Sequence, residues 1–134
     1  MEFAFGGNST VRSTGVYQIE PRSHSNFEFK YSIELGELDP KDFDCQKISF
    51  DQHVWPILVT LMDKYAANKY DLLSMNCNHF SNEFINMLFK GKKKLPNFIN
   101  RAAYLGSWFK CFVPRRYLIV TPPGMEEEAA ALAE

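Results

Sequence analysis

The segment YDLLSMNCNHFSN, residues 70–82, decides how this 134-residue chain is interpreted. Asn76 precedes a run with apolar residues at helical spacing, so the sequence predicts an N-cap at Asn76 and a helix from Cys77 to Phe89. Gly91 is predicted as the C′ residue that ends this helix. Cys77 then lies at a helix N-terminus, where unpaired N–H groups and the helix dipole favour a thiolate and can hold an oxyanion.

Two interpretations of Cys77 stay open on the residues alone. A free cysteine is most often a small buried hydrophobe, and helical spacing puts Cys77 near Phe84 and Leu88 on the inward face. That placement suits a core residue, and it equally suits a nucleophile at the floor of a cleft. Because buried cysteines are usually inert, the residues by themselves favour the structural role.

A cysteine nucleophile needs a base, and the sequence offers three histidines, His24, His53 and His79. His79 lies two positions after Cys77, about 200° around the helix, so the two side chains face opposite ways. We therefore predict that His79 orders the local loop. His24 lies in a polar, loop-like segment and His53 lies near the start of the first helix. Nothing in the sequence ties either to Cys77, and both are expected to be surface histidines.

Around this segment the sequence predicts an α+β fold, with strands first and helices after them. Strands are expected at 2–5, at 14–19 and at 27–35, where apolar and polar residues alternate. A helix is expected over 51–67, with its first residue, an aspartate, as the N-cap. A further short helix is expected to begin at Pro96.

The composition indicates one globular domain. Hydrophobic residues make up 46% of the chain and aromatic residues 15%, which is enough for a core. The net charge of −1 gives no basic excess of the kind that nucleic acids or anionic membranes attract, and no stretch is long and apolar enough to span a bilayer. We expect residues 1–122 to form the domain and the acidic, alanine-rich residues 123–134 to form a mobile tail.

The three cysteines, Cys45, Cys77 and Cys111, are odd in number and widely spaced. This spacing does not look like a disulfide framework, and the lack of a CxxC pair argues against a structural zinc site. We therefore expect reduced thiols, a cytoplasmic or nuclear protein, no metal and no cofactor.

Several motifs, in the right order along the chain, resemble those of the PPPDE superfamily, whose members include the deSUMOylating isopeptidases. NCNHFSN, at 76–82, resembles the nucleophile motif, and EFAFGG, at 2–7, resembles the end of the family's N-terminal strand. TGVY, at 14–17, matches the following strand, and LPNFINRAAYLG, at 95–106, resembles the closing motif. The ordered match covers most of the chain.

The resemblance implies a permuted papain-like α+β fold, an antiparallel sheet packed against helices, with Cys77 as the nucleophile of a Cys–His dyad. It implies cleavage of the isopeptide or peptide bonds of SUMO or ubiquitin-like modifiers, so the expected partners are SUMO- or ubiquitin-conjugated proteins. Two alternatives stay open: a non-catalytic module that binds such proteins, and a thioesterase that removes S-acyl groups from proteins.

The resemblance also implies a catalytic histidine on a strand that comes just before the part matching Glu2–Phe5. This sequence carries no such strand, so we expect the base to be missing, together with a central strand of the sheet. Three explanations stay open: a longer active parent protein, a short form that has lost catalysis, or a histidine supplied by a second subunit. An uncovered sheet edge also predicts poor solubility or a homodimer.

Overall fold

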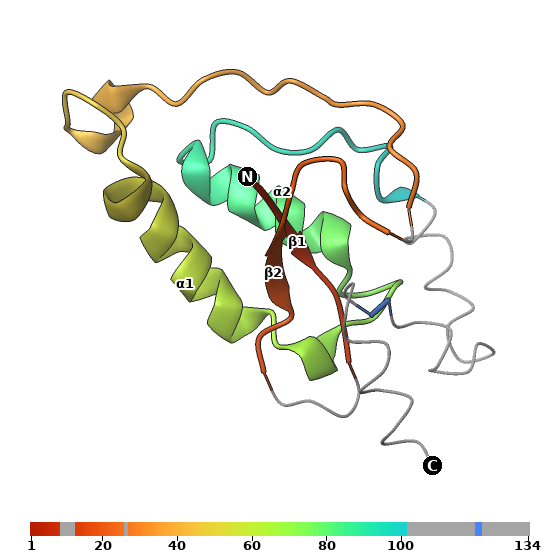
Figure 1. Ribbon diagram of the computed structural model, residues 1–134. Helices are drawn as coiled ribbons and strands as arrows, with labels where there is room; N and C mark the ends of the chain where they lie inside the picture. Colours follow the sequence, from red (N-terminus) through yellow and green to blue (C-terminus); the bar gives the residue numbers. More distant parts are fainter. Residues whose placement is uncertain (9–12, 26, 102–119, 122–134) are drawn as a thin grey trace, which may run out of the picture.

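The computed structural model describes residues 1–8, 13–25, 27–101 and 120–121 (Figure 1). Within these residues the chain forms a mixed α/β structure, in which a two-stranded antiparallel sheet lies beside two α-helices. Cys111 and the tail predicted at 123–134 lie outside the described residues.

The sheet joins β1 (Glu2–Phe5) to β2 (Val16–Ile19), in a register that sets the last residue of β1 opposite the first residue of β2. The prediction for β1 is confirmed. The second strand was expected over 14–19 and begins two residues later, because Thr14 forms an isolated bridge with Ala66 instead. This bridge ties the hairpin to the chain that follows the first helix.

The strand predicted at 27–35 is wrong. The structure describes this segment as extended chain, and within the described residues no other strand pairs with it. Its alternate aromatic side chains are about half exposed, at 58% for Phe27, 46% for Phe29 and 56% for Tyr31. A period-two pattern becomes a strand only where a neighbouring strand and a core cover one face, and in the described part of the chain neither covers this face.

The first helix starts later than its sequence pattern predicted. A wide π-helical turn, η2 (Phe50–Val54), leads into α1 (Trp55–Lys64). Pro56 lies in the first turn of α1, where its missing N–H removes no intrahelical hydrogen bond. Asp51 is therefore not the N-cap of this helix. It lies inside the π-helical turn, whose own N-cap position is taken by Ser49.

The second helix, α2 (Cys77–Leu88), begins where predicted and ends one residue early. At its end the Gly91 N–H donates to the Asn86 carbonyl at 2.8 Å, which is the hydrogen bond of a Schellman turn. Lys90 takes the C′ position with a φ of 52°, and Gly91 follows it with a φ of 81°. Gly91 was predicted at the C′ position and lies one position later, at C″.

Two lysines after α2 bind the chain that precedes the first helix. Lys92 forms an ion pair with Asp42, and the Lys90 Nζ lies 4.6 Å from the centre of the Phe43 ring. Both partners belong to the short 3-10 helix η1 (Pro40–Phe43). Exposed pairs of this kind contribute less than about 1 kcal/mol each, but they hold η1 near the C-terminal end of α2.

The short helix predicted from Pro96 is described only as far as Arg101. Up to that point the chain makes turns, in which the Ile99 N–H donates to the Pro96 carbonyl at 3.1 Å and the Arg101 N–H donates to the Phe98 carbonyl at 3.3 Å. The rest of the predicted segment lies outside the described residues.

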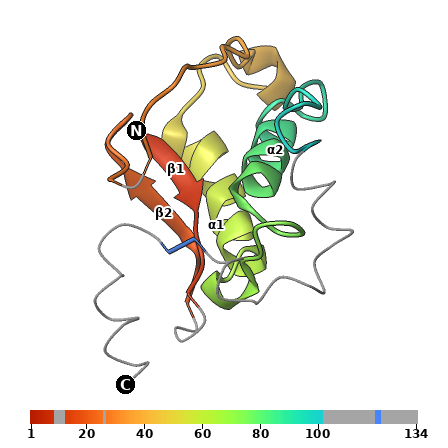
Figure 2. The ribbon, with the colours of Figure 1, turned by 90° about the vertical axis from the view of Figure 1, so that its right-hand side faces the viewer.

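The core is a cluster of aromatic rings around Phe5, at the end of β1. The Phe5 centroid lies 4.9 Å from that of Tyr65, 5.0 Å from that of Tyr70 and 6.3 Å from that of Phe80. The pair with Tyr65 is edge-to-face and the other two are tilted, and aromatic pairs at these distances add to the gain from burial. Of these four rings, Phe5 comes from the sheet and the others come from the chain around the two helices. Figure 2 shows the hairpin beside these helices. Aliphatic side chains complete the cluster: Val16, Leu58 and Leu61.

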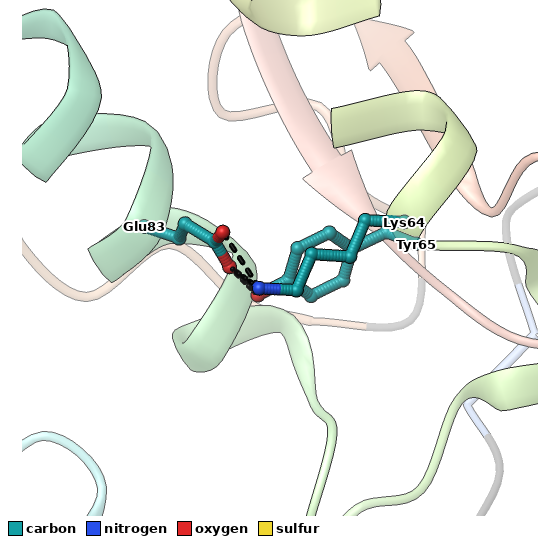
Figure 3. Close-up of polar contacts among 3 residues, drawn as sticks. All are labelled: Lys64, Tyr65 and Glu83. Atoms are coloured by element: carbon teal, nitrogen blue, oxygen red, sulfur yellow. Dashed lines mark hydrogen bonds and ion pairs between the residues drawn. The ribbon is translucent and has the colours of Figure 1, made fainter. Parts of the chain in front are cut away.

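A polar link joins α1 to α2 beside this core (Figure 3). The Glu83 carboxylate of α2 accepts hydrogen bonds from the Lys64 Nζ and from the Tyr65 hydroxyl, each at 2.7 Å. Partial burial alone would raise the pKa of Glu83, but these two donors hold it below its ordinary value. The link therefore contains a carboxylate that stays ionised in the folded state.

Candidate active site

Cys77 is the first residue of α2, and the cap before it fixes where the helix starts. The Asn76 side-chain oxygen accepts hydrogen bonds from the backbone N–H groups of Asn78 at 2.9 Å and His79 at 3.1 Å. The Asn76 side-chain nitrogen donates to the Leu72 carbonyl at 2.8 Å. Asn76 is only 3% exposed, so these bonds form away from water. The N-cap predicted from sequence is confirmed.

Cys77 is exposed to solvent and is not a core residue. The helix turns Phe80, which is 0% exposed, into the aromatic cluster, and Phe84 packs against the same cluster. The inward-face position predicted for Cys77 is therefore wrong: the residue is exposed at the first position of α2, and burial on this helix begins with Phe80. Solvent access is what a nucleophile requires, and it removes the simplest structural explanation for this cysteine.

The first turn of α2 leaves few N–H groups for an oxyanion. Those of Asn78 and His79 donate to the Asn76 side chain, and that of Phe80 donates to the Asn76 carbonyl at 3.2 Å. The Cys77 N–H is directed at the cysteine's own sulfur. The expectation of several helix N-terminal donors therefore narrows to the N–H groups of Cys77 and Asn78, which both interact with the Cys77 sulfur, although that of Asn78 is also bonded to the Asn76 side chain.

The surroundings of the Cys77 sulfur keep it protonated. Although the residue as a whole is exposed, the protein atoms on the inner side of the sulfur reduce its hydration, and this desolvation raises the pKa of the thiol. Hydrogen bonds from Tyr70 and from the backbone N–H groups of Asn78 and Cys77 oppose that rise without reversing it. The lowered pKa predicted for a helix N-terminus is thus not observed, because desolvation disfavours the thiolate more than the helix end favours it. Cys77 is a neutral thiol at neutral pH and needs a base at the moment of attack.

Two tyrosines lie beside Cys77, and sequence analysis named neither. Tyr70, which is 3% exposed, hydrogen-bonds to the sulfur, and Tyr17 of β2 interacts with it electrostatically. Burial raises the pKa of both phenols, and the neighbouring Cys77 raises it further. Both tyrosines therefore keep their protons and can donate to a thiolate. Gly7 admits Tyr70 to this place, since a Cβ on Gly7 would lie 2.2 Å from the Tyr70 Cβ.

His79 is confirmed as a local structural residue. Its Nδ1 lies 2.9 Å from the side-chain oxygen and 3.2 Å from the backbone nitrogen of Asn76, completing a capping box. Its Nε2 lies 3.0 Å from the side-chain nitrogen of Asn100. Burial lowers the pKa of His79, so the ring is neutral. Both ring nitrogens are occupied by asparagines, and His79 is not the base for Cys77.

The other two histidines lie in different settings. The Nδ1 of His53 lies 3.0 Å from the backbone nitrogen of Ser49, which is a local contact at the start of η2. The Nε2 of His24 lies 3.1 Å from the Tyr17 hydroxyl. His24 was expected on the surface, and it is half-buried beside Tyr17.

Two hollows flank α2. One is a polar cleft of about 740 Å³, lined by amide side chains of α2 that include Asn82. The other is a groove of about 950 Å³ between Ser81 and Ile85 of α2 and the extended segment at 27–35. Cys77 lines neither, but Ser81 and Ile85 lie one and two helical turns after it on the same face. The groove therefore leads along α2 towards the end that carries the thiol.

The candidate site consists of Cys77 and the polar groups around it. Among residues 1–8, 13–25, 27–101 and 120–121, no three His, Cys, Asp or Glu side chains gather where they could hold a metal ion. In the same part of the chain, no helix has the length and apolar character needed to cross a bilayer.

The chain matches the family model described as "PPPDE putative peptidase domain" over residues 1–117. It is 30% identical to a DeSI-like protein of Arabidopsis thaliana, over 95% of this chain and 51% of that protein. It is 30% identical to a desumoylating isopeptidase 1 homolog of Caenorhabditis elegans, over 96% of this chain and 37% of that protein. It is also 30% identical to the DeSI-like protein sdu1 of Schizosaccharomyces pombe, over 81% of this chain and 49% of that protein.

No solved structure matches the chain. The chain spans between 37% and 51% of the lengths of these three curated relatives, so each of them extends well beyond the shared part. The family match includes both strands, both helices and Cys77. On this match, the chain belongs to the PPPDE peptidase family.

Proposed function

We propose that this chain carries the nucleophile of a cysteine isopeptidase that removes SUMO or a ubiquitin-like modifier from proteins. The observation that carries the proposal is the exposed Cys77 at the capped start of α2, in a chain of the PPPDE peptidase family. The name of the desumoylating isopeptidase 1 homolog supports the substrate class. The proposal includes a permuted papain-like arrangement, in which a helix beginning at the nucleophile packs against an antiparallel sheet.

In the proposed reaction, the Cys77 thiolate attacks the carbonyl carbon of the isopeptide bond. The Cys77 N–H stabilises the resulting oxyanion. The tetrahedral intermediate collapses, the lysine amine leaves with a proton, and a thioester joins the modifier to Cys77. Water then hydrolyses the thioester, which frees the modifier's carboxylate and restores the thiol. Tyr70 contributes a hydrogen bond to the sulfur whenever it is ionised.

The test replaces Cys77 in the protein as the cell makes it, since the relatives are longer than this chain. The substrates are SUMO and ubiquitin, each joined through an isopeptide bond to a fluorescent lysine peptide. Turnover, followed by fluorescence polarisation, is expected to disappear in Cys77→Ser. Cys45→Ser is the matched control and is expected to keep full activity, because Cys45 hydrogen-bonds only to nearby carbonyls. Turnover retained by Cys77→Ser overturns the proposal.

A non-catalytic module that binds modified proteins is the second candidate, and the raised pKa of Cys77 favours it. Under this alternative, the unmodified protein binds labelled SUMO or ubiquitin conjugates without cleaving them, and Cys77→Ser binds them equally well. Fluorescence anisotropy measures the binding and gel electrophoresis measures any cleavage. Cleavage that depends on Cys77 removes this candidate.

A further inference from the structure

We propose that the polar cleft beside α2 binds the main chain of an extended peptide through the side chains of Asn78, Asn82 and Asn86. These asparagines line the cleft and are spaced four residues apart, so they lie on one face of α2 in successive turns. The volume of the cleft, about 740 Å³, is in the range of cavities that hold ligands. The peptide belongs to the protein that carries the modifier, and this assignment of its source rests on the proposed function.

The three side chains have hydrogen-bonding groups that no other described residue uses. The Asn78 side-chain nitrogen donates to the Ile99 carbonyl at 3.3 Å, which leaves its side-chain oxygen as an acceptor. The Asn82 side-chain oxygen accepts a hydrogen bond from the Leu95 N–H at 2.8 Å, which leaves the N–H groups of its amide as donors. The side chain of Asn86, which is exposed, makes no hydrogen bond within the described part of the chain. The cleft therefore offers both donors and acceptors to a ligand.

The spacing of these amides matches that of an extended peptide. Four residues of α-helix rise about 6 Å, and two residues of a β-strand rise about 6.6 to 6.8 Å. Every second residue of a strand presents its N–H and C=O groups on the same edge, and an asparagine amide can pair with both. The difference is less than about 1 Å per step, and rotation of an asparagine side chain absorbs it. Such a ladder binds the main chain and does not depend on the peptide's side chains.

The charged side chains of the cleft favour a neutral ligand over a strongly anionic one. Lys64 and Glu83 form an ion pair across the cleft wall and neutralise each other. Burial lowers the pKa of His79, so its ring adds no charge. Lys94 is then the remaining charged side chain among the described lining residues. Phosphate groups are usually bound by several positive charges, whereas a peptide main chain is polar and uncharged.

The position of the cleft relative to Cys77 favours the protein that carries the modifier over the modifier itself. The tail of the modifier ends at the carbonyl that the sulfur attacks, so it must reach Cys77. Cys77 does not line the cleft, and Asn78 is turned about 100° from it around the helix. The main chain of the modified protein is separated from the reacting bond by the length of a lysine side chain. That separation allows it to lie in the cleft while the isopeptide bond lies at the thiol.

The test measures the binding of a labelled peptide to this chain by fluorescence anisotropy. The probe is a fluorescein-labelled peptide in which threonine and alanine alternate around one central lysine. Asn86→Ala removes a donor and an acceptor, and Asn82→Asp removes the amide donors but keeps the oxygen that bonds to Leu95. Each variant should raise the Kd about five- to tenfold. Probes that are N-methylated at one residue at a time should lose affinity at every second residue, because only alternate N–H groups face the asparagines.

Gln52→Ala is the matched control, because Gln52 is an exposed amide of η2 that lines neither hollow, and it should keep the Kd of the parent chain. Circular dichroism checks that each variant keeps its helices. A parent chain that does not bind the probe, asparagine variants with an unchanged Kd, or a methylation series without alternation overturns the proposal. The proposed function survives each of these results if Cys77→Ser abolishes turnover. Turnover retained by Cys77→Ser overturns the proposed function and the assignment of the peptide's source, even where the asparagines bind the probe.

Discussion

The β1–β2 hairpin and the extended segment at 27–35 carry similar strand patterns and have different structures. The last residue of β1, Phe5, is 2% exposed, whereas Phe27 in the segment is 58% exposed. The hairpin strands pair with each other, and α2 covers one of their faces. The segment has the more regular alternation, yet no described strand pairs with it. An apolar stripe indicates which face would be buried, but burial requires another surface.

The largest expected difference in stability is between variants that lose one aromatic ring from the core and one from the extended segment. Phe80→Ala removes a ring that is 0% exposed at the centre of the core and should cost about 3–5 kcal/mol in the free energy of unfolding. Phe29→Ala removes a half-exposed ring and should cost less than about 1 kcal/mol, mostly its contact with Arg22. Urea unfolding followed by circular dichroism measures both. Equal losses would mean that the segment is packed as firmly as the core.

Gly15 tests the close packing of the hairpin, and Gly91, which follows α2, is its comparison. A Cβ on Gly15 would lie 2.3 Å from the Gly6 carbonyl oxygen and 2.6 Å from the Phe5 ring, so Gly15→Ala should cost about 3 kcal/mol. A Cβ on Gly91 would meet no atom within 4 Å, so the cost of Gly91→Ala, about 1 kcal/mol, comes only from its left-handed φ of 81°. Thermal unfolding of the two variants compares them. A smaller loss for Gly15→Ala would show that the hairpin yields easily.

A third comparison sets the ionised Glu83, in the link between α1 and α2, against Glu28 in the extended segment. Because the pKa of Glu83 is lowered in the folded state, its stabilisation is present above the unfolded value of about 4.3 and is lost as pH falls through the folded value. Glu83→Gln should therefore cost up to about 1 kcal/mol at pH 7 and less near pH 3. Glu28→Gln, in the extended segment, is the control and should change neither. Parallel pH profiles for Glu83→Gln and the parent chain would contradict this prediction.

The smallest expected effect on stability comes from the exposed aromatic row. Changing Phe27, Phe29 and Tyr31 together to serine should alter the free energy of unfolding by less than about 1 kcal/mol, because these rings are already half solvated. It should reduce self-association, since exposed apolar residues on an unpaired extended segment favour pairing with another chain. Sedimentation velocity measures the change. A parent chain that sediments as a monomer would contradict the homodimer predicted from sequence.

Local signals predicted the parts of the fold that local interactions form. Asn76 bonds to N–H groups two and three residues ahead, so its role as an N-cap follows from the adjacent sequence. Pro56, in the first turn of α1, is also a local signal, although the predicted helix began earlier, at residue 51. The strand at 27–35 failed because its outcome depends on a distant partner. No sequence window contains that information.

In the candidate site too, the features set by neighbouring residues were predictable and those set by distant residues were not. The start of α2 at Cys77 and the local role of His79 follow from capping and helix geometry and were predicted, whereas the exposure of Cys77 was not. The raised pKa of Cys77 comes from desolvation and is opposed by a hydrogen bond from Tyr70, and Tyr17 of β2 also lies in the electrostatic surroundings of the thiol. Aromatic residues are common in this sequence, so nothing marked these two tyrosines until the fold brought them to the cysteine.

The unpaired segment at 27–35 also makes the chain divisible. A protease that cut it would leave the hairpin on one fragment and both helices on the other, while Phe5 from the first fragment and Tyr65 and Phe80 from the second still complement one another. Folding would then become a bimolecular reassembly. The strength of the aromatic cluster could be read as a dissociation constant between two pieces, and the activity of a reassembled site could be titrated with either one.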